Sequence, residues 1–386
     1  MTRRSASGMR WLAAGGAVAV VAATLLAGPA ATAATTAPVG WQPQRMSVMV
    51  QVSSVASQTG GSARLAAVLE DIRLHHRDPS RPGFIQNLVL QDIAPASGNG
   101  SPLFTGVLDA VAPYLPGGPR AAFDHVFVGT LLEPPAPAGA PSYWSPYVEG
   151  IASPALRSAH LAASTRAAAA FVARYPSVRV DWYLSWEAFL APLMYADSFA
   201  YPAPPRIVPS VLRADYLDYQ KRLVAALSGI RPGRAFLWSP ALDRSWAQVS
   251  VDGQGTVVPA NLRSYLSAVQ SATGGRLWLD LQDGLSRPCL EVGGAAGNTI
   301  ADRVDWYHRL ATMGLPLAAL QVNAETFVSP YCPGVSQPAQ VLGRLYAYEQ
   351  GSIPIGPSFD IFGWSAIATP QTAPRAAVQW RTGLSR

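Results

Sequence analysis

The stretch VRVDWYLSWE, residues 178–187, decides the expected fold because its side chains alternate in character. One set of alternate positions is mostly polar and ends at Glu187, whereas the other set is apolar and ends at Trp186. A second stretch, LPLAALQVNAE at 315–325, follows the same scheme and ends at Glu325. In a closed parallel barrel, a strand sends alternate side chains to the interior and to the surrounding helices. Both glutamates are therefore predicted to point into a barrel at its mouth.

Six further stretches resemble strands, and most of the eight are followed by a helical pattern. The strand candidates cover 45–53, 84–92, 122–133, 178–187, 234–240, 276–283, 317–325 and 358–364. The helical patterns cover 63–76, 155–176, 212–230, 261–272, 300–314 and 338–351. Repeated alternation of strand and helix predicts parallel pairing. No G-x-G-x-x-G motif follows the first strand, so an α/β fold of the (β/α)8 TIM-barrel type is favoured over an open doubly wound sheet.

The N-terminus has the composition of an export signal. Arginines at 3, 4 and 10 precede an apolar run, which ends in the small-x-small pattern of Ala31, Thr32 and Ala33. We expect a secretory signal peptide at 1–33, a linker at 34–44 and a single catalytic barrel at 45–386, in a secreted protein. The alternative is that the apolar run remains as a membrane anchor, although it is near the lower length limit for spanning.

Charge and cysteine content narrow the class of protein. Removing residues 1–33 leaves 26 basic and 23 acidic residues, and this small excess is no nucleic-acid signature. Cys289 and Cys332 lie in the loops after neighbouring predicted strands and are expected to form a disulfide in an oxidising compartment; the alternative is two free thiols. No H-x-H or H-E-x-x-H pattern occurs, so neither a metal nor another cofactor is expected.

Two inward carboxylates at the catalytic end of a barrel match the needs of glycosidic bond hydrolysis. Glu187 is the candidate acid/base and Glu325 the candidate nucleophile. Each could instead be a structural carboxylate paired with an arginine, because an unpaired buried charge is costly.

The chain resembles the large clan of retaining glycosidases built on this barrel, in which the strand-four glutamate is the acid/base and the strand-seven glutamate the nucleophile. That clan commonly has asparagine before its acid/base, where this chain has Trp186. The segments LWSPALDRSW (237–246), LWLDLQDGL (277–285) and LQVNAETF (320–327) also resemble an uncharacterised glycosidase-like barrel family with W-S-P, Q-D-G and N-x-E-x-F segments. This second resemblance covers roughly residues 180–365 and implies the fold more than the substrate.

Several residues near the predicted strand ends are candidate ligands of a sugar. Polar candidates are Gln282, Asp283, Asn323 and Asp92, and aromatic candidates are Trp364, Trp246 and Tyr183, because sugar rings pack their C–H faces on aromatic planes. Strand alternation favours Gln282 over Asp283, which could equally be a turn former before Gly284 or an alternative catalytic acid. Asp92 could instead cap a helix, and a single tryptophan is more often a core residue.

The sequence therefore predicts an exported glycoside hydrolase that acts with retention on an oligo- or polysaccharide. One alternative is a carbohydrate-binding barrel without catalysis, since fold does not settle function. The other is a hydrolase or lyase of another bond type that uses Asp283.

Overall fold

The computed structural model of the chain describes residues 37–38, 43–132, 150–188, 193–199, 208–242, 245–283, 299–324 and 338–360, with 338–342 and 357–360 as backbone only. All of them belong to one compact unit, Thr35–Arg386, whereas the other unit, Met1–Ala34, lies outside the described residues. The signal peptide at 1–33 and the domain boundaries therefore stay predictions.

Eight parallel strands form one curled sheet, in the order β7-β6-β5-β4-β3-β2-β1-β8. Their bounds are β1 Arg45–Gln51, β2 Phe84–Asp92, β3 His125–Gly129, β4 Asp181–Leu184, β5 Phe236–Trp238, β6 Leu277–Gln282, β7 Ala319–Asn323 and β8 Pro357–Asp360. Consecutive strands from β1 to β7 pair in parallel, and β8 pairs with β1. The parallel pairing predicted from the sequence is confirmed, although most observed strands are shorter than the predicted ones.

The two end strands of this sheet approach each other just before β8. Val322 of β7 forms an isolated parallel bridge with Ile355. The amide of Gly356 also donates a hydrogen bond to the carbonyl of Val322 at 2.9 Å. The segment that leads into β8 is therefore attached to β7.

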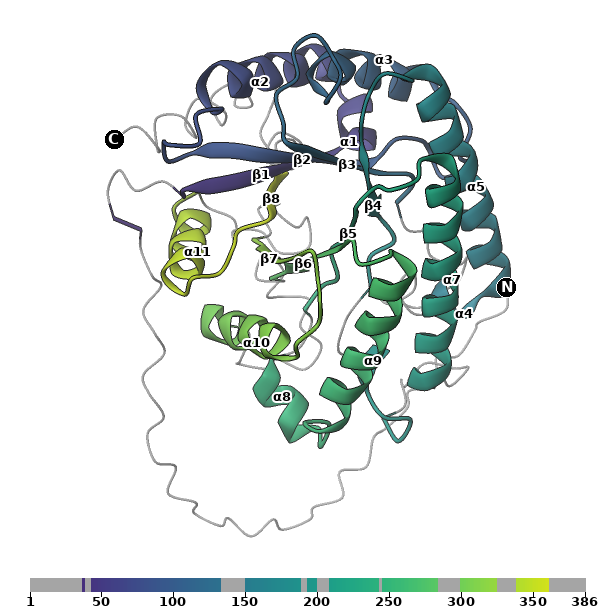
Figure 1. The fold of residues 1–386 in the computed structure, drawn as a ribbon, viewed down its shortest axis with the longest axis vertical. Helices are drawn as coiled ribbons and strands as arrows, with labels where there is room; N and C mark the ends of the chain where they lie inside the picture. Colours follow the sequence, from purple (N-terminus) through teal and green to yellow (C-terminus); the bar gives the residue numbers. More distant parts are fainter. Residues whose placement is uncertain are drawn as a thin grey trace, which may run out of the picture. The chain divides into compact units, whose positions relative to one another are not determined.

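A helix follows most strands, and Figure 1 shows the longer helices on the outer side of the curled sheet. The bounds are α1 Val52–Ala56, α2 Gly61–His75, α3 Pro102–Val111, the 3-10 helix η1 Ala112–Tyr114, α4 Gly150–Ala152, α5 Pro154–Arg174, α7 Pro209–Ile230, α8 Trp246–Val251, α9 Val257–Ala272, α10 Ile300–Thr312 and α11 Pro338–Gln350. The sequence patterns did not predict α3, whose middle residue Gly106 weakens a helical signal.

Local sequence fixes where the longer helices begin. Helix α5 starts with Pro154 after Ser153, whose hydroxyl accepts a hydrogen bond from the amide of Leu156. Helix α10 starts with a capping box, in which the Thr299 side chain bonds the Asp302 amide and the Asp302 side chain bonds the Thr299 amide. These caps satisfy backbone donors that have no partner within the helix.

Strand alternation separates the apolar side chains into two cores. The inner core lies inside the curl of the sheet, and β1 to β5 each contribute one buried side chain to it: Met49, Val89, Phe127, Tyr183 and Leu237. Trp278 of β6 packs against this group, with its ring centroid 5.2 Å from that of Phe127. A much larger core fills the space between the sheet and the helices. The inner face therefore holds a small apolar layer with polar residues on either side of it.

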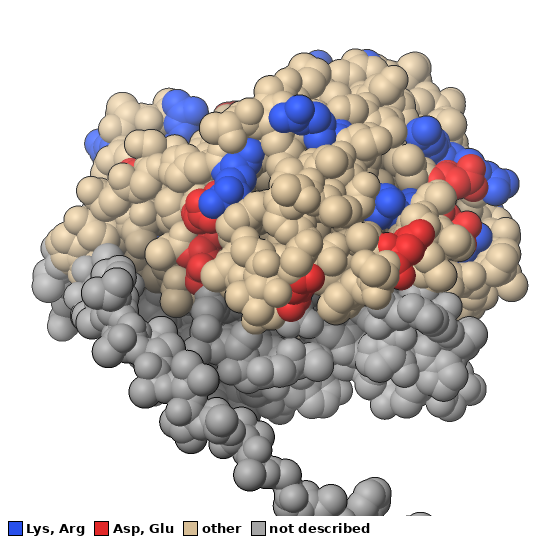
Figure 2. Space-filling view, turned by 90° about the horizontal axis from the view of Figure 1, so that it is seen from below, with Lys and Arg blue, Asp and Glu red and all other residues tan. Residues whose placement is uncertain are grey.

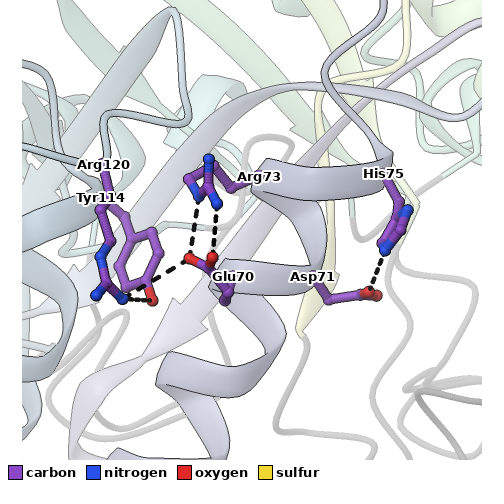
Figure 3. A network of polar contacts seen from close by, with 6 residues as sticks. All are labelled: Glu70, Asp71, Arg73, His75, Tyr114 and Arg120. Carbon is purple, nitrogen blue, oxygen red and sulfur yellow. Dashed lines mark hydrogen bonds and ion pairs between the residues drawn. The ribbon is translucent and has the colours of Figure 1, made fainter.

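The charged side chains visible in Figure 2 are distributed with both signs side by side. Figure 3 shows one such group, in which Glu70 of α2 pairs with Arg73 at 2.6 Å and Arg120 approaches both Glu70 and Tyr114. Nearby, His75 lies 3.8 Å from Asp71. Exposed pairs of this kind contribute little to stability.

The position of Gly129 at the end of β3 gives a test of the packing between strands. A Cβ at this glycine would lie 2.2 Å from the carbonyl oxygen of Gln91 and 3.0 Å from Cβ of Ser185. Gly129→Ala should therefore lower the free energy of unfolding by about 1–3 kcal/mol, measured by urea denaturation. Gly106→Ala is the matched control: nothing lies within 4 Å of its Cβ, and it should raise stability by up to about 1 kcal/mol. Equal effects of the two variants would contradict this packing.

Candidate functional site

Glu187 lies just beyond β4 and is held from inside the curled sheet. Its side chain is 6% exposed. The hydroxyl of Tyr183 donates a hydrogen bond to its Oε1 at 2.5 Å, and Nε2 of Gln91 donates another to the same oxygen at 3.1 Å. Tyr183 belongs to the inner core, so Glu187 shares the inward face that strand alternation predicts. The carboxyl group is therefore buried but bonded to two neutral donors.

Gln91 reaches Glu187 from β2 across the intervening strand β3. Gly129 of β3 pairs with Tyr183 of β4 and lies next to Gln91, and it has no side chain to block the approach. At this strand end, Asp92 was the candidate sugar ligand predicted from the sequence, and Gln91 was not among the candidates. The alternation of Asn87, Val89 and Gln91 along β2 is the signal that could have found it, since Val89 faces the inner core.

The side chain of Asp92 points away from Glu187 and accepts a hydrogen bond from a backbone amide. Both of its carboxylate oxygens accept from the amide of Ser53, at 3.2 and 3.3 Å, in the first turn of α1. This is the helix-capping alternative, and the contact favours it over a role as a sugar ligand.

A second carboxyl group, that of Asp280 on β6, lies fully buried inside the sheet. Burial raises the pKa of Asp280 well above its usual range, the hydroxyl of Ser239 opposes the shift, and the negative charge of Glu187 adds to it. The Ser239 hydroxyl donates to Oδ2 at 3.4 Å, whereas Oδ1 lies near the side-chain amide of Gln321, which also opposes the rise in pKa. Asp280 is therefore best described as a neutral carboxylic acid, whose pKa the charge of Glu187 raises further.

Gly356 makes room for Asp280 on the far side from β5. A Cβ at Gly356 would lie 2.0 Å from Oδ1 of Asp280 and 2.7 Å from Nε2 of Gln321. Gln321 of β7 pairs with Asp280 of β6, and the interaction of its side chain with the Asp280 carboxyl group opposes the raised pKa. Asp280 lies two residues before Gln282, so strand alternation also places it on the inward face of β6, although it was not among the candidate ligands.

Gln282 and Asn323 lie next to each other at the ends of β6 and β7, as expected for two ligands of one sugar. Both are buried, and both donate to Ser239 on β5: Gln282 to its carbonyl at 2.8 Å and Asn323 to its hydroxyl at 3.5 Å. The structure therefore brings these two predicted ligands together, on the same face as Asp280.

Asp283 occupies the opposite side of the sheet and takes part in a buried ion pair. Its side chain is fully buried, and its Oδ2 lies 3.0 Å from Nη1 of Arg344 on α11. The hydroxyl of Tyr348 donates to the same oxygen at 3.0 Å. This arrangement favours a structural role, and it gives no support to Asp283 as a sugar ligand or catalytic acid.

Trp246 packs at the periphery of the described structure. It is the first residue of α8, its ring meets that of Trp306 edge to face with centroids 5.0 Å apart, and the guanidinium of Arg309 lies 4.3 Å from its centroid. The Trp246 ring therefore packs against two side chains of α10. These contacts favour the core-packing alternative over a role as a sugar platform.

Four predicted residues lie outside the described residues: Glu325, Trp364, Cys289 and Cys332. The nucleophile, one aromatic platform and the disulfide therefore stay predictions. In the part of the chain that the structure describes, no three His, Cys, Asp or Glu side chains form a group that could hold a metal ion. None of the described helices combines the length and apolar character needed to cross a membrane.

Comparison with solved structures shows the fold. The chain is similar to a protein from Bacteroides thetaiotaomicron VPI-5482 that is provisionally assigned as an alpha-L-fucosidase, with a TM-score of 0.52 and 11% identity over 90% of this chain and 98% of that chain. It is also similar to a psychrophilic family 10 endo-beta-1,4-xylanase, with a TM-score of 0.42 and 12% identity over 83% of this chain and 89% of that one. A third match is the xylanase Xyn10A from Cellvibrio japonicus, with a TM-score of 0.42 and 12% identity over 89% and 98% of the two chains.

These neighbours are glycoside hydrolases, and at such low identity the likeness concerns the fold alone. Of these three, the protein provisionally assigned as a fucosidase has a TM-score above 0.5 and matches nearly the whole length of both chains, so the likeness of fold rests on it. No family model and no curated protein sequence matches the chain.

The buried acid Asp280 gives a pH-dependent prediction. Because its folded pKa is raised, its contribution to stability is fully present below the unfolded pKa of about 4 and is lost as the pH rises through the folded pKa. Asp280→Asn removes this titration, so the variant should gain stability relative to the wild type as the pH rises above about 4. Urea denaturation at several pH values measures the difference, and a difference that does not change with pH would contradict the neutral acid.

Asp109→Asn is a control of opposite sign for this experiment. Hydrogen bonds from Arg174, followed by Tyr175, lower the pKa of Asp109. The stability from this carboxylate is present above the unfolded pKa and is lost as the pH falls through the folded pKa, so the variant should lose stability only at the higher pH values.

The ion pair of Asp283 can be tested separately from catalysis. Arg344→Met removes a guanidinium that is paired with a buried carboxylate, and it should lower the free energy of unfolding by about 3–5 kcal/mol. The double variant Asp283→Leu/Arg344→Met should be more stable than either single variant, because it removes both charges. If Asp283 were catalytic, Asp283→Asn would instead abolish turnover and leave the free energy of unfolding unchanged.

Proposed function

We propose that this protein is a glycoside hydrolase that cleaves an oligo- or polysaccharide with retention, with Glu187 as acid/base and Glu325 as nucleophile. The observation that carries the proposal is the buried carboxyl group of Glu187, aimed into the sheet at the carboxyl end of β4 by Tyr183 and Gln91. In TIM barrels, this end of the strands is where active sites lie. The shared fold with a provisionally assigned alpha-L-fucosidase supports the class of reaction.

The hydrogen bonds of Glu187 suit an acid/base residue. Tyr183 and Gln91 both donate to Oε1 and hold the carboxyl group, which would deliver its proton to the leaving oxygen. Glu325 would attack the anomeric carbon at the same time and form a glycosyl-enzyme intermediate. Glu187, now ionised, would then take a proton from the attacking water. Retention predicts that the two carboxyl groups lie about 5–5.5 Å apart.

The proposal includes a closed (β/α)8 barrel as the frame of the site. The bridge between Val322 and Ile355 supports closure between β7 and β8, which would place Glu187 and Glu325 around one mouth. Gln282 and Asn323 then lie on the wall of that mouth as sugar ligands. We also propose that the protein is exported through its N-terminal signal and that Cys289 and Cys332 pair after export.

The function is tested by incubating the mature protein with a panel of glycans and aryl glycosides. Glu187→Gln should lower kcat by about 10²–10⁴-fold on natural glycosides, because protonation of the leaving oxygen is lost. On 2,4-dinitrophenyl glycosides, whose leaving group departs without a proton, kcat/KM should change far less, because it reports the first step alone. The kcat on these substrates should still fall, because the second step loses its base. Glu325→Gln should abolish turnover on both kinds of substrate, and NMR of the first product should show retained anomeric configuration.

Glu70→Gln is the control, because Glu70 lies in the surface group on α2 and should leave turnover unchanged. Full activity of Glu187→Gln or Glu325→Gln would refute the mechanism. Saturable glycan binding with no turnover in the wild type would instead identify a carbohydrate-binding barrel.

A further inference from the structure

The chain that carries Glu187 lies past the end of β4, where no regular ladder holds it, and other contacts fix each of its neighbours. The hydroxyl of Ser185 donates to the carbonyl of Leu131 at 2.6 Å. The carbonyl of Ala188 accepts from the amide of Ala241 at 3.0 Å. The carbonyl of Trp186, directly before Glu187, accepts a hydrogen bond from the hydroxyl of Tyr216. The last of these contacts comes from the helix layer and not from the sheet.

Trp186 and the helices behind it form a buried group that we name the aromatic anchor: His160, Trp186, Tyr216 and Tyr219. The ring centroid of Trp186 lies 4.8 Å from that of Tyr219 and 5.0 Å from that of His160. Tyr216 and Tyr219, both on α7, stack with their rings 9° from parallel. Every member is less than 10% exposed, so the indole of Trp186 is held on the helix side of the sheet.

Two polar groups of the aromatic anchor, the Tyr216 hydroxyl and Nε2 of His160, bond backbone carbonyls just beyond β4 and β3, whereas Nε1 of Trp186 has no hydrogen-bond partner among the described residues. Nε2 of His160 lies 2.8 Å from the carbonyl oxygen of Leu132, which follows β3. Its Nδ1 lies 2.7 Å from the hydroxyl of Tyr219. Burial lowers the pKa of His160 to about 4, with the Leu132 bond opposing the shift, so the imidazole is neutral: Nε2–H donates to Leu132 and Nδ1 accepts from Tyr219. The chain after β3 and the chain after β4 are thus attached to one rigid group.

Burying a polar group is unfavourable unless it is hydrogen-bonded, so the hydroxyl and imidazole groups of the anchor require partners in the core. Two of these partners are backbone carbonyls: that of Trp186, directly before Glu187, and that of Leu132, in the chain after β3. Rotation of the peptide between Trp186 and Glu187 would move the carboxyl group away from its two inner donors. A displacement of about 1 Å at a reacting group can cost about 10²-fold in rate.

We propose that Tyr216 is a positioning residue for Glu187: its hydroxyl fixes the peptide that precedes Glu187, and His160 and Tyr219 hold the neighbouring chain in the same way. The inference rests on the proposed function, because it assigns a catalytic purpose to the placement of Glu187. It also gives Trp186 a role at the position where the retaining clan has asparagine: the indole joins this carboxyl-bearing segment to α5 and α7.

The test compares Tyr216→Phe with Tyr265→Phe by ¹³C NMR titration of the Glu187 carboxyl group, assigned with Glu187→Gln. Tyr265 is a matched control, because it is equally buried and stacks on Tyr216, but its hydroxyl donates to Gln220 at 2.6 Å and not to the site. Tyr216→Phe should shift the titration midpoint of Glu187 and lower kcat by about 10–10²-fold with KM nearly unchanged. Tyr265→Phe should lower stability and leave the midpoint in place.

Equal midpoints in the two variants would overturn the positioning role, whatever their stability. If Tyr216→Phe does not fold, Tyr219→Phe takes its place. It removes the nearer of two hydroxyl partners of His160 Nδ1, the other being that of Ser164 at 3.3 Å, and it should also shift the midpoint of Glu187. In the Glu187→Gln background, Tyr216→Phe should cause no further loss of residual turnover. Because the NMR titration needs no substrate, it still decides the positioning role if the glycan panel refutes the proposed hydrolase.

Discussion

The alternation of side chains along β4 and the residues that follow it is the constraint on which the candidate site depends. Trp186 and Glu187 are adjacent in the chain and therefore point to opposite sides of the sheet. The indole enters the helix layer between His160 and Tyr219, whereas the carboxyl group meets Tyr183 inside. A shift of one residue would exchange the two environments, burying the indole in the inner core and the carboxylate among aromatic rings.

Three buried acids illustrate how environment decides the role of a carboxyl group. Asp283 forms a buried ion pair with Arg344, which favours a structural role. Asp280 has a serine hydroxyl at 3.4 Å and a raised pKa, so it is suited to remaining neutral. Glu187 accepts from the hydroxyl of Tyr183 and the amide of Gln91 at the carboxyl end of β4, and it is the proposed acid/base. The same residue types therefore differ through the groups that surround them.

Much of the fold could be predicted from the sequence, because strands and helices leave periodic patterns in the chain. The site could be predicted only in part. Gln282 and Asn323 lie together on the inner face, as alternation indicates. Asp92 and Asp283 do not, because each directly follows an inward residue, Gln91 or Gln282, and bonds a group outside the inner face: the amide of Ser53 in α1 or Arg344 in α11. An aspartate at a strand end suggested a sugar ligand, but the alternation of side chains along the strand directs both aspartates away from the inner face.

By itself, the sequence determined the order of strands and helices, the inward direction of Glu187 and the outward direction of Trp186. These properties are local, since they follow from the two-residue period of a strand and the turn of a helix. Only the tertiary structure decided which groups meet: Gln91 with Glu187 across Gly129, Tyr216 with the carbonyl of Trp186, and Arg344 with Asp283. Such contacts join residues far apart in the chain, and no local pattern encodes the approach of one strand or helix to another.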